Sequence, residues 1–256
     1  MRRGRARIVL CAAPLLLLLG AGTAYAVRAE IGNNWVSAVA EVRPQDLPAR
    51  GGVPVTLTNV TRIGTHDGTR PPALRTMRLQ FDKHGFLDLR GLPACSERRL
   101  ADATPAQARR RCARALVGTG TGKARVELPG ARPVTVSSPL SFFNGPRLRG
   151  RPTVIAHAYE RLPEPKALLV TIPIERVSNG RYRYRAVVSL PEIAAGYGSA
   201  TLAEARIGAT RRRGGRTVGY VNARCAGGRL QVHGVLLFAN GDLFPATLAS
   251  PCRVPR

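Results

Sequence analysis

The sequence predicts an all-β protein, mainly an antiparallel β-sandwich-like fold, with one short disulfide-tethered helix near residues 105–115. Three observations lead to this expectation. Strand-like patterns recur along almost the whole chain, glycine and proline separate them at short intervals, and only one segment has a convincing helical period. Short strands that alternate with turn residues are typical of antiparallel sandwiches.

The expected strands are apolar runs or runs of alternating polarity, each bounded by turn residues. They cover residues 35–43, 53–61, 75–82, 115–128, 133–143, 152–160, 166–175, 181–190, 199–207, 217–225, 229–239 and 242–249. The clearest alternation places Tyr182 and Tyr184 on one face, which we expect to point inward. The opposite face then carries Arg181, Arg183 and Arg185, because successive side chains of a strand point to opposite sides.

The one expected helix begins at Thr104-Pro105, a capping hydroxyl followed by proline at the first helical position. Ala108, Cys112 and Ala115 then form one stripe, which we expect to face the protein body. The arginines between them point largely to water: Arg109, Arg110 and Arg114.

Residues 1–26 have the three-part pattern of a secretory signal peptide. Arginines precede the apolar run Ile8–Leu19, and small residues before the end predict cleavage after Ala26. The apolar run is shorter than the roughly 20 residues of a membrane-spanning helix, so an uncleaved tether is the less favoured alternative. Residues 27–256 form the exported β-rich region, with no spanning helix expected. It is one large sandwich, or two smaller β units joined near 144–151.

Four cysteines follow the leader, namely Cys95, Cys112, Cys225 and Cys252. An even number in an exported chain favours disulfides, and no spacing typical of a zinc site is present. Three pairings are possible. The inward position of Cys112, a short segment after Cys95, favours Cys95–Cys112 and leaves Cys225–Cys252 as the second pair.

The second pair has a geometric difficulty. Turn signals at 227–228 and 240–241 predict a three-strand meander with Cys225 and Cys252 on its outer strands. In a flat meander such residues lie roughly 9–10 Å apart. A disulfide needs Cα atoms within about 7 Å, so this bond requires the strand ends to curl or fray.

The chain is strongly basic: 40 basic and 15 acidic residues give a net charge of +25, and without the four leader arginines it is +21. Such a charge attracts polyanions through a field that salt screens. The arginine clusters are either ordinary solvated surface or contacts for an anionic cell-envelope polymer or lipid headgroups. The candidate contacts are Arg109, Arg110, Arg114, Arg181, Arg183, Arg185, Arg211, Arg212 and Arg213. Because aromatic residues are few, sequence-specific nucleic-acid binding is not expected.

Motifs that suggest chemistry fail on inspection. The glycine-rich run 118–123 lacks the spacing of a nucleotide-binding loop and is better explained as a bulged strand. Ser199 is not followed by the glycine of a nucleophile elbow. We therefore expect no catalytic residue, cofactor or metal. The alternative is a secreted hydrolase whose His, Ser and Asp gather in space, for which His66 and His157 are the probes.

Several motifs recur together in a known group of proteins. They are 91–95, Cys112 with 115–118, 143–145, 157–159, 193–198, 238–241 and 251–253. Over residues 75–253 the chain resembles a family of secreted, functionally uncharacterised β-rich proteins of high-GC bacteria. The resemblance implies export and a β-rich fold, and it brings no known activity. The expected protein is thus secreted or envelope-associated and non-enzymatic, with a binding or structural role and an oligomeric state left open.

Overall fold

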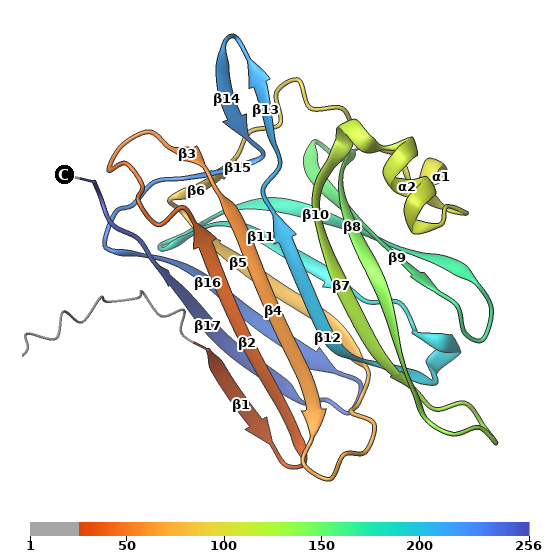
Figure 1. Cartoon of the computed structure of the whole chain (residues 1–256). Helices are drawn as coiled ribbons and strands as arrows, with labels where there is room; N and C mark the ends of the chain where they lie inside the picture. Colours follow the sequence, from red (N-terminus) through yellow and green to blue (C-terminus); the bar gives the residue numbers. More distant parts are fainter. Residues whose placement is uncertain (1–25, 256) are drawn as a thin grey trace, which may run out of the picture.

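The computed structural model describes residues 26–255, and antiparallel strands dominate it (Figure 1). The predicted all-β fold class is confirmed. The leader predicted over residues 1–26 lies outside the described residues except for Ala26, where they begin.

One large antiparallel sheet forms the body of the protein. In spatial order its strands are β1 (Val27–Ile31), β2 (Asn34–Arg43), β4 (Thr56–Thr65), β12 (Gly198–Ile207), β7 (Leu116–Val126), β8 (Val134–Leu148), β9 (Arg151–Glu160), β10 (Lys166–Asn179), β11 (Tyr182–Ser189), β5 (Leu74–Asp82), β16 (Arg229–Phe238) and β17 (Leu243–Pro251). A three-stranded sheet contains β3 (Val53–Pro54), β15 (Val221–Ala223) and β6 (Gly85–Leu87). A hairpin of β13 (Thr210–Arg213) and β14 (Arg216–Gly219) projects beyond both layers (Figure 1).

The large sheet folds into two facing layers because β10 belongs to both. Residues 166–173 of β10 pair with β9, whereas residues 174–179 pair with β11. The strands up to β9 form the front layer of Figure 1, and β11, β5, β16 and β17 lie behind them. This two-layer arrangement is the sandwich-like architecture that the sequence predicts.

The far edges of the two layers also approach each other. The Val42 amide donates to the Ser250 hydroxyl at 2.9 Å, which links β2 to β17. Beyond these strands the Leu47 amide donates to the Arg253 carbonyl at 2.9 Å, and Asp46 forms an ion pair with Arg253. The sheet is therefore nearly closed.

Apolar side chains from both layers fill the space between them. Val36 and Ile63 of the front layer pack against Leu236, Phe238 and Phe244 of the back layer. The two phenylalanine rings meet edge to face, with centroids 5.3 Å apart, which is a favoured aromatic geometry. Alternate residues of each strand supply this core, in agreement with the alternation in the sequence.

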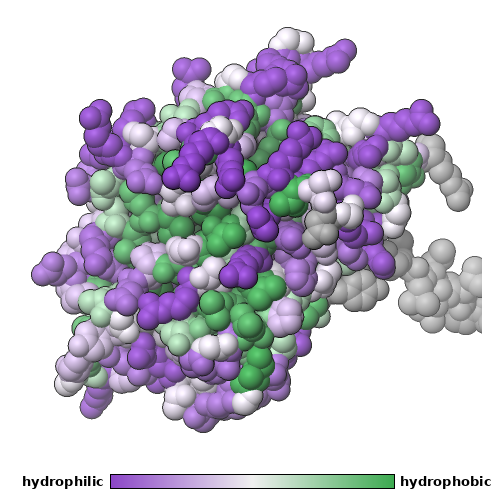
Figure 2. All heavy atoms as spheres, turned by 180° about the vertical axis from the view of Figure 1, so that it is seen from behind, coloured by the Kyte–Doolittle hydropathy of each residue, from purple (hydrophilic) through white to green (hydrophobic). Residues whose placement is uncertain are grey.

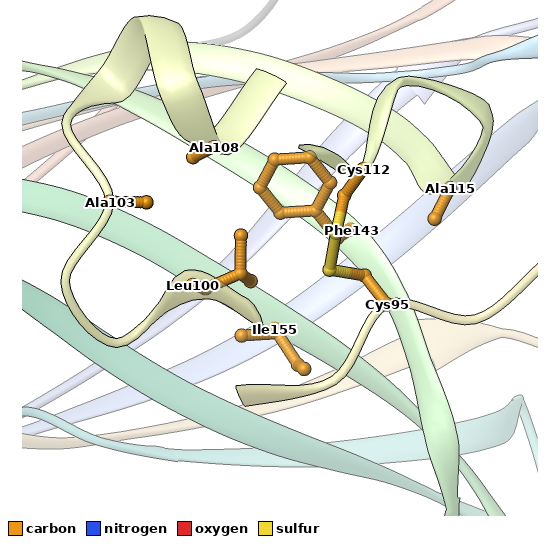
Figure 3. Packing of buried hydrophobic residues seen from close by; sticks show 8 residues of the cluster. All are labelled: Cys95, Leu100, Ala103, Ala108, Cys112, Ala115, Phe143 and Ile155. Atoms are coloured by element: carbon orange, nitrogen blue, oxygen red, sulfur yellow. A yellow bond between two sulfur atoms is a disulfide. The ribbon is translucent and has the colours of Figure 1, made fainter. Parts of the chain in front are cut away.

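A disulfide-bonded cap covers the outer face of β8 and β9. It consists of α1 (Glu97–Leu100), α2 (Pro105–Arg111) and a 3₁₀ turn, η1 (Ala113–Ala115). The expected stripe is confirmed, since Ala108, Cys112 and Ala115 are all buried. Figure 3 shows them around Phe143 and the Cys95–Cys112 bond. The helix expected through residue 115 ends at Arg111, and α1 was not predicted.

The second disulfide, Cys225–Cys252, is also present, with its Cα atoms 5.8 Å apart. The predicted three-strand meander is wrong, because β15 joins β3 and β6 and does not pair with β16. Cys225 instead donates its amide to the Pro48 carbonyl at 3.0 Å. Because the chain leaves the large sheet before Cys225, no middle strand separates the two cysteines.

Most strands fall where the sequence predicts them. The exceptions are β1, β6 and β13, for which no strand was expected. Residues 144–151, considered as a loop or a joint between units, lie in the hairpin of β8 and β9, within one sheet.

The glycine-rich run 118–123 is part of β7, whose pairing with β8 is irregular between Leu116 and Gly118, as expected for a bulged strand. At Gly120 a Cβ atom would lie 1.9 Å from the Glu204 carbonyl oxygen, so only glycine fits there.

The loop between β11 and β12 contains three successive residues with left-handed backbone, Ala194, Ala195 and Gly196. The buried Glu160 carboxylate holds this loop by accepting the Ala194 amide at 3.1 Å. Left-handed backbone costs a non-glycine residue roughly 1–2 kcal/mol, and glycine is exempt from this cost.

Substituting Ala195→Gly is expected to raise the free energy of unfolding by about 0.5–1 kcal/mol, because Ala195 is exposed and only strain is lost. Calorimetry of the purified protein measures this as a higher melting temperature. Ala194→Gly is the matched control: it relieves the same strain but deletes a methyl group that is 1% exposed, so its gain should be smaller or absent. Equal melting temperatures for wild type and Ala195→Gly would contradict the strain.

Candidate functional site

The cap presents an exposed face of arginines. Arg109, Arg110 and Arg114 are exposed there, as predicted, and none of them forms an ion pair with the described residues. Two further arginines hold the helices together: Arg99 donates to the Arg111 carbonyl at 2.5 Å, and Arg111 donates back to the Arg99 carbonyl at 3.2 Å. Neither of the two best-formed hollows of the described chain is lined by these cap residues.

The arginines of the β13–β14 hairpin are mostly engaged by one carboxylate. Asp88, which is 8% exposed, accepts from Arg211 at 3.4 Å and lies 3.8 Å from Arg213. Arg90 contacts both oxygens of the same carboxylate, and this hydrogen bonding lowers the pKa of Asp88 below its ordinary value. Arg212 donates to the Gly215 carbonyl at 3.4 Å and is exposed. Arg211 and Arg213 are therefore structural partners of Asp88.

The strand β11 does not keep the strict alternation that the sequence predicts. Its pairing with β5 shifts register between Tyr182 and Tyr184, and β10 shifts register against it between Arg176 and Asn179. A bulge inserts an unpaired residue and breaks the two-residue period. As a result Tyr182 and Arg183, expected on opposite faces, both line one hollow.

This hollow, which we name the basic groove, measures about 480 Å³. Its walls come from the β5–β6 turn and from the end of the β10–β11 hairpin. The lining residues are Lys83, Arg176, Val177, Ser178, Gly180, Tyr182 and Arg183. Three of them are cationic and none is acidic, so the groove combines concavity with one sign of charge. Clefts of this kind concentrate the electric field and attract ligands of opposite charge.

The acidic side chains closest in sequence to the basic groove are already occupied. Asp82 forms an ion pair with Arg181 at 3.3 Å. Glu175 forms ion pairs with Arg151 at 3.2 Å and with Arg185 at 2.5 Å. Those arginines hold the pKa of Glu175 below its ordinary value, Arg185 through its hydrogen bond most of all. Of the three arginines predicted on β11, only Arg183 is thus without an ion pair among the described residues.

The other two cations of the basic groove also lack an ion pair among the described residues. Lys83 and Arg176 are exposed and Arg183 is half-buried. Within residues 26–255 no carboxylate lies within ion-pair distance of any of the three, although Lys83 donates to the Gly180 carbonyl at 3.1 Å. Three uncompensated cations around one hollow leave a site for an anion.

A buried carboxylate holds the turn beside the groove. Asp82 is 4% exposed and accepts the His84 amide at 3.0 Å and the Gln231 amide at 3.1 Å. It also orients Arg181, which donates to the Arg229 carbonyl at 3.2 Å. The turn that carries Lys83 is therefore rigid, which reduces the entropy that a bound ligand must remove.

The two histidines of the hydrolase alternative differ in their burial. His157 is fully buried beneath the cap, and its Nε2 donates to the Ala103 carbonyl at 2.8 Å. Burial lowers the pKa of His157, so the ring is neutral at neutral pH. Ser141 lies directly across from it on β8 and is equally buried. His66, in contrast, is exposed, and its Nε2 lies 3.4 Å from the Glu30 carboxylate.

The back face of the protein also exposes apolar side chains. Seen from behind, they form a band surrounded by hydrophilic residues (Figure 2). Val187 of β11 is 41% exposed and Leu243 of β17 is 52% exposed. Nothing among the described residues indicates which partner would contact this band.

Two kinds of site are absent from the part of the chain that the structure describes. No cluster of three His, Cys, Asp or Glu side chains is placed to hold a metal ion there. None of the helices in that part has the length and apolar character needed to cross a membrane.

The fold and the site together define a two-layer, disulfide-bonded β protein with a basic surface groove. The two disulfides fit an oxidising compartment. Comparison with known proteins finds no matching family model, curated protein or solved structure. The resemblance to secreted proteins of high-GC bacteria therefore stays a prediction.

Proposed function

We propose that this protein is exported, acts without catalysis, and binds an anionic envelope polymer in the basic groove. The observation that carries the proposal is the meeting of Lys83, Arg176 and Arg183 around one hollow, while the nearby Asp82 and Glu175 pair with other arginines and no carboxylate of residues 26–255 pairs with these three. The leader pattern and the net charge support the same function, since an exported protein of this charge meets anionic polymers outside the cell membrane.

The net charge of the protein attracts anions, and the groove adds hydrogen-bond donors in a fixed arrangement. Hydrogen bonds to charged groups contribute about 1.5–3 kcal/mol each when both partners lose water. Guanidinium groups bind oxyanions through paired N–H donors, and Arg176 and Arg183 offer two such groups beside the ammonium of Lys83. An anionic group seated here would be held more firmly than one lying on the cap arginines.

A polymer fits this site better than a membrane surface does. The groove is concave, whereas the headgroups of a bilayer present a broad surface. The exposed arginine face of the cap is the part of the chain that would suit lipid headgroups. Binding to anionic vesicles through the cap is therefore the outcome that competes with groove binding.

The test compares two variants with the same loss of charge. The groove variant carries Lys83→Ala, Arg176→Ala and Arg183→Ala, and the cap variant carries Arg109→Ala, Arg110→Ala and Arg114→Ala. Retention of the secreted protein on heparin is measured against a salt gradient, and affinity is measured at about 0.15 M salt. We expect the groove variant to lose at least about tenfold in affinity and the cap variant about twofold or less.

Two results would contradict the proposal. Equal losses in both variants mean that binding is only the unspecific attraction of a basic protein. A larger loss in the cap variant, together with binding to vesicles that contain anionic lipid, assigns the contact to the cap. Circular dichroism of both variants controls for misfolding.

A further inference from the structure

We infer that the polymer held in the basic groove is a saccharide whose repeating unit carries the anionic group; this inference rests on the proposed function. It follows from the part of the lining that is not charged. Tyr182 and Val177 provide an aromatic and an aliphatic wall, and Ser178 provides a hydroxyl. A site built only for a polyanion has no use for these groups.

The apolar wall and the cations differ in part in their exposure. Tyr182 and Val177 are half-buried, while Lys83 and Arg176 are exposed at the rim. The ring of His233 lies 6.3 Å from that of Tyr182, between ring centroids, with the two rings tilted by 38°. Two of the cations are therefore more exposed than the aromatic ring, and the third, Arg183, is half-buried like Tyr182.

A sugar ring that carries a carboxylate, phosphate or sulfate matches this lining. Its anionic substituent contacts the rim cations, and the C–H face of the ring packs on Tyr182, whose body is apolar and whose hydroxyl stays polar. The remaining sugar hydroxyls can exchange hydrogen bonds with Ser178, which both donates and accepts. A hollow of about 480 Å³ is within the range of sites that bind small ligands, so it suits a short stretch of such a chain.

Titration calorimetry with oligogalacturonate and with linear polyphosphate, matched in number of anionic groups, tests the inference. We expect oligogalacturonate to bind at least about tenfold more tightly. Tyr182→Ala should weaken oligogalacturonate binding about tenfold and change polyphosphate binding about twofold or less. Tyr182→Phe keeps the ring and should restore most of the lost affinity.

A second measurement needs no variant. In proton NMR, sugar ring protons that lie against an aromatic face shift upfield on binding to the wild-type protein. Equal affinity for both polymers, with no upfield shift, would overturn the saccharide inference and leave the proposed function standing. If the groove variant binds both polymers as the wild type does, the proposed function itself fails.

Discussion

The double substitution Cys225→Ala and Cys252→Ala is expected to lower the free energy of unfolding by about 3–4 kcal/mol. The bond closes a sequence separation of 27 residues, and removing such a constraint increases the entropy of the unfolded chain. Its native surroundings are well packed, since Cys225 and Cys252 lie in a buried cluster with Leu47, Val55 and Leu230. The loss should therefore be at least as large as chain entropy alone predicts. Urea unfolding followed by circular dichroism measures it.

The position of this bond explains why the effect should spread beyond the cysteines. Cys252 donates its amide to the Gly228 carbonyl at 2.9 Å, and the next residue, Arg253, pairs with Gln45 and Leu47. These contacts close the two layers at the edge of β2. The Cys95–Cys112 pair closes a shorter separation, 17 residues, and should give a slightly smaller loss, about 3 kcal/mol. A double variant at Cys225 and Cys252 that unfolds at the wild-type urea concentration would refute this account.

Local patterns were sufficient to predict much of this fold. The alternation of apolar residues located most strands of the large sheet, because a strand with one buried face must repeat every two residues. The helix stripe placed Cys112 inward and so predicted its partner Cys95. These inferences succeeded because each depends on residues close together in the chain.

The groove could not be predicted in this way, because its parts are distant in sequence. Lys83 directly follows the expected strand 75–82, and Arg176 directly follows the expected strand 166–175. They meet because β5 pairs with β11, a pairing that no local pattern specifies. The bulge that turns Tyr182 and Arg183 to the same hollow is equally invisible to a period-two pattern. The Asn240-Gly241 turn signal was correct, yet the strand before β16 belonged to another sheet.

The sequence also could not show which of the candidate arginines form ion pairs. The sequence grouped Arg181, Arg183 and Arg185 as equals, as it did Arg211, Arg212 and Arg213. Ion pairs separate them in the structure, because few carboxylates are available and each binds more than one arginine. Which cations stay uncompensated depends on tertiary contacts, and those are the cations that can bind a ligand.

Asp88→Ala is expected to destabilise the protein by about 2–3 kcal/mol. The carboxylate is 8% exposed and holds Arg90 and Arg211, with Arg213 close by, at the base of the β13–β14 hairpin. Removing one partner of a buried ion pair typically costs 3–5 kcal/mol, and the solvent exposure of Arg90 and Arg213 reduces that figure. Asp88→Asn keeps an acceptor for the Arg90 amide, so it should lose about half as much.

The same carboxylate contributes a defined dependence on pH. Because the pKa of Asp88 is lowered in the folded protein, the unfolded chain binds the proton first as the solution is acidified. Its stabilisation is complete above the ordinary aspartate pKa of about 3.9 and is lost as the pH falls through the folded pKa. Urea unfolding of wild type and Asp88→Asn between about pH 6 and pH 2.5 tests this. The stability difference should shrink toward acid, since protonation makes the wild-type side chain neutral like the amide; a difference that is constant across this range would show that Asp88 acts through packing and not through its charge.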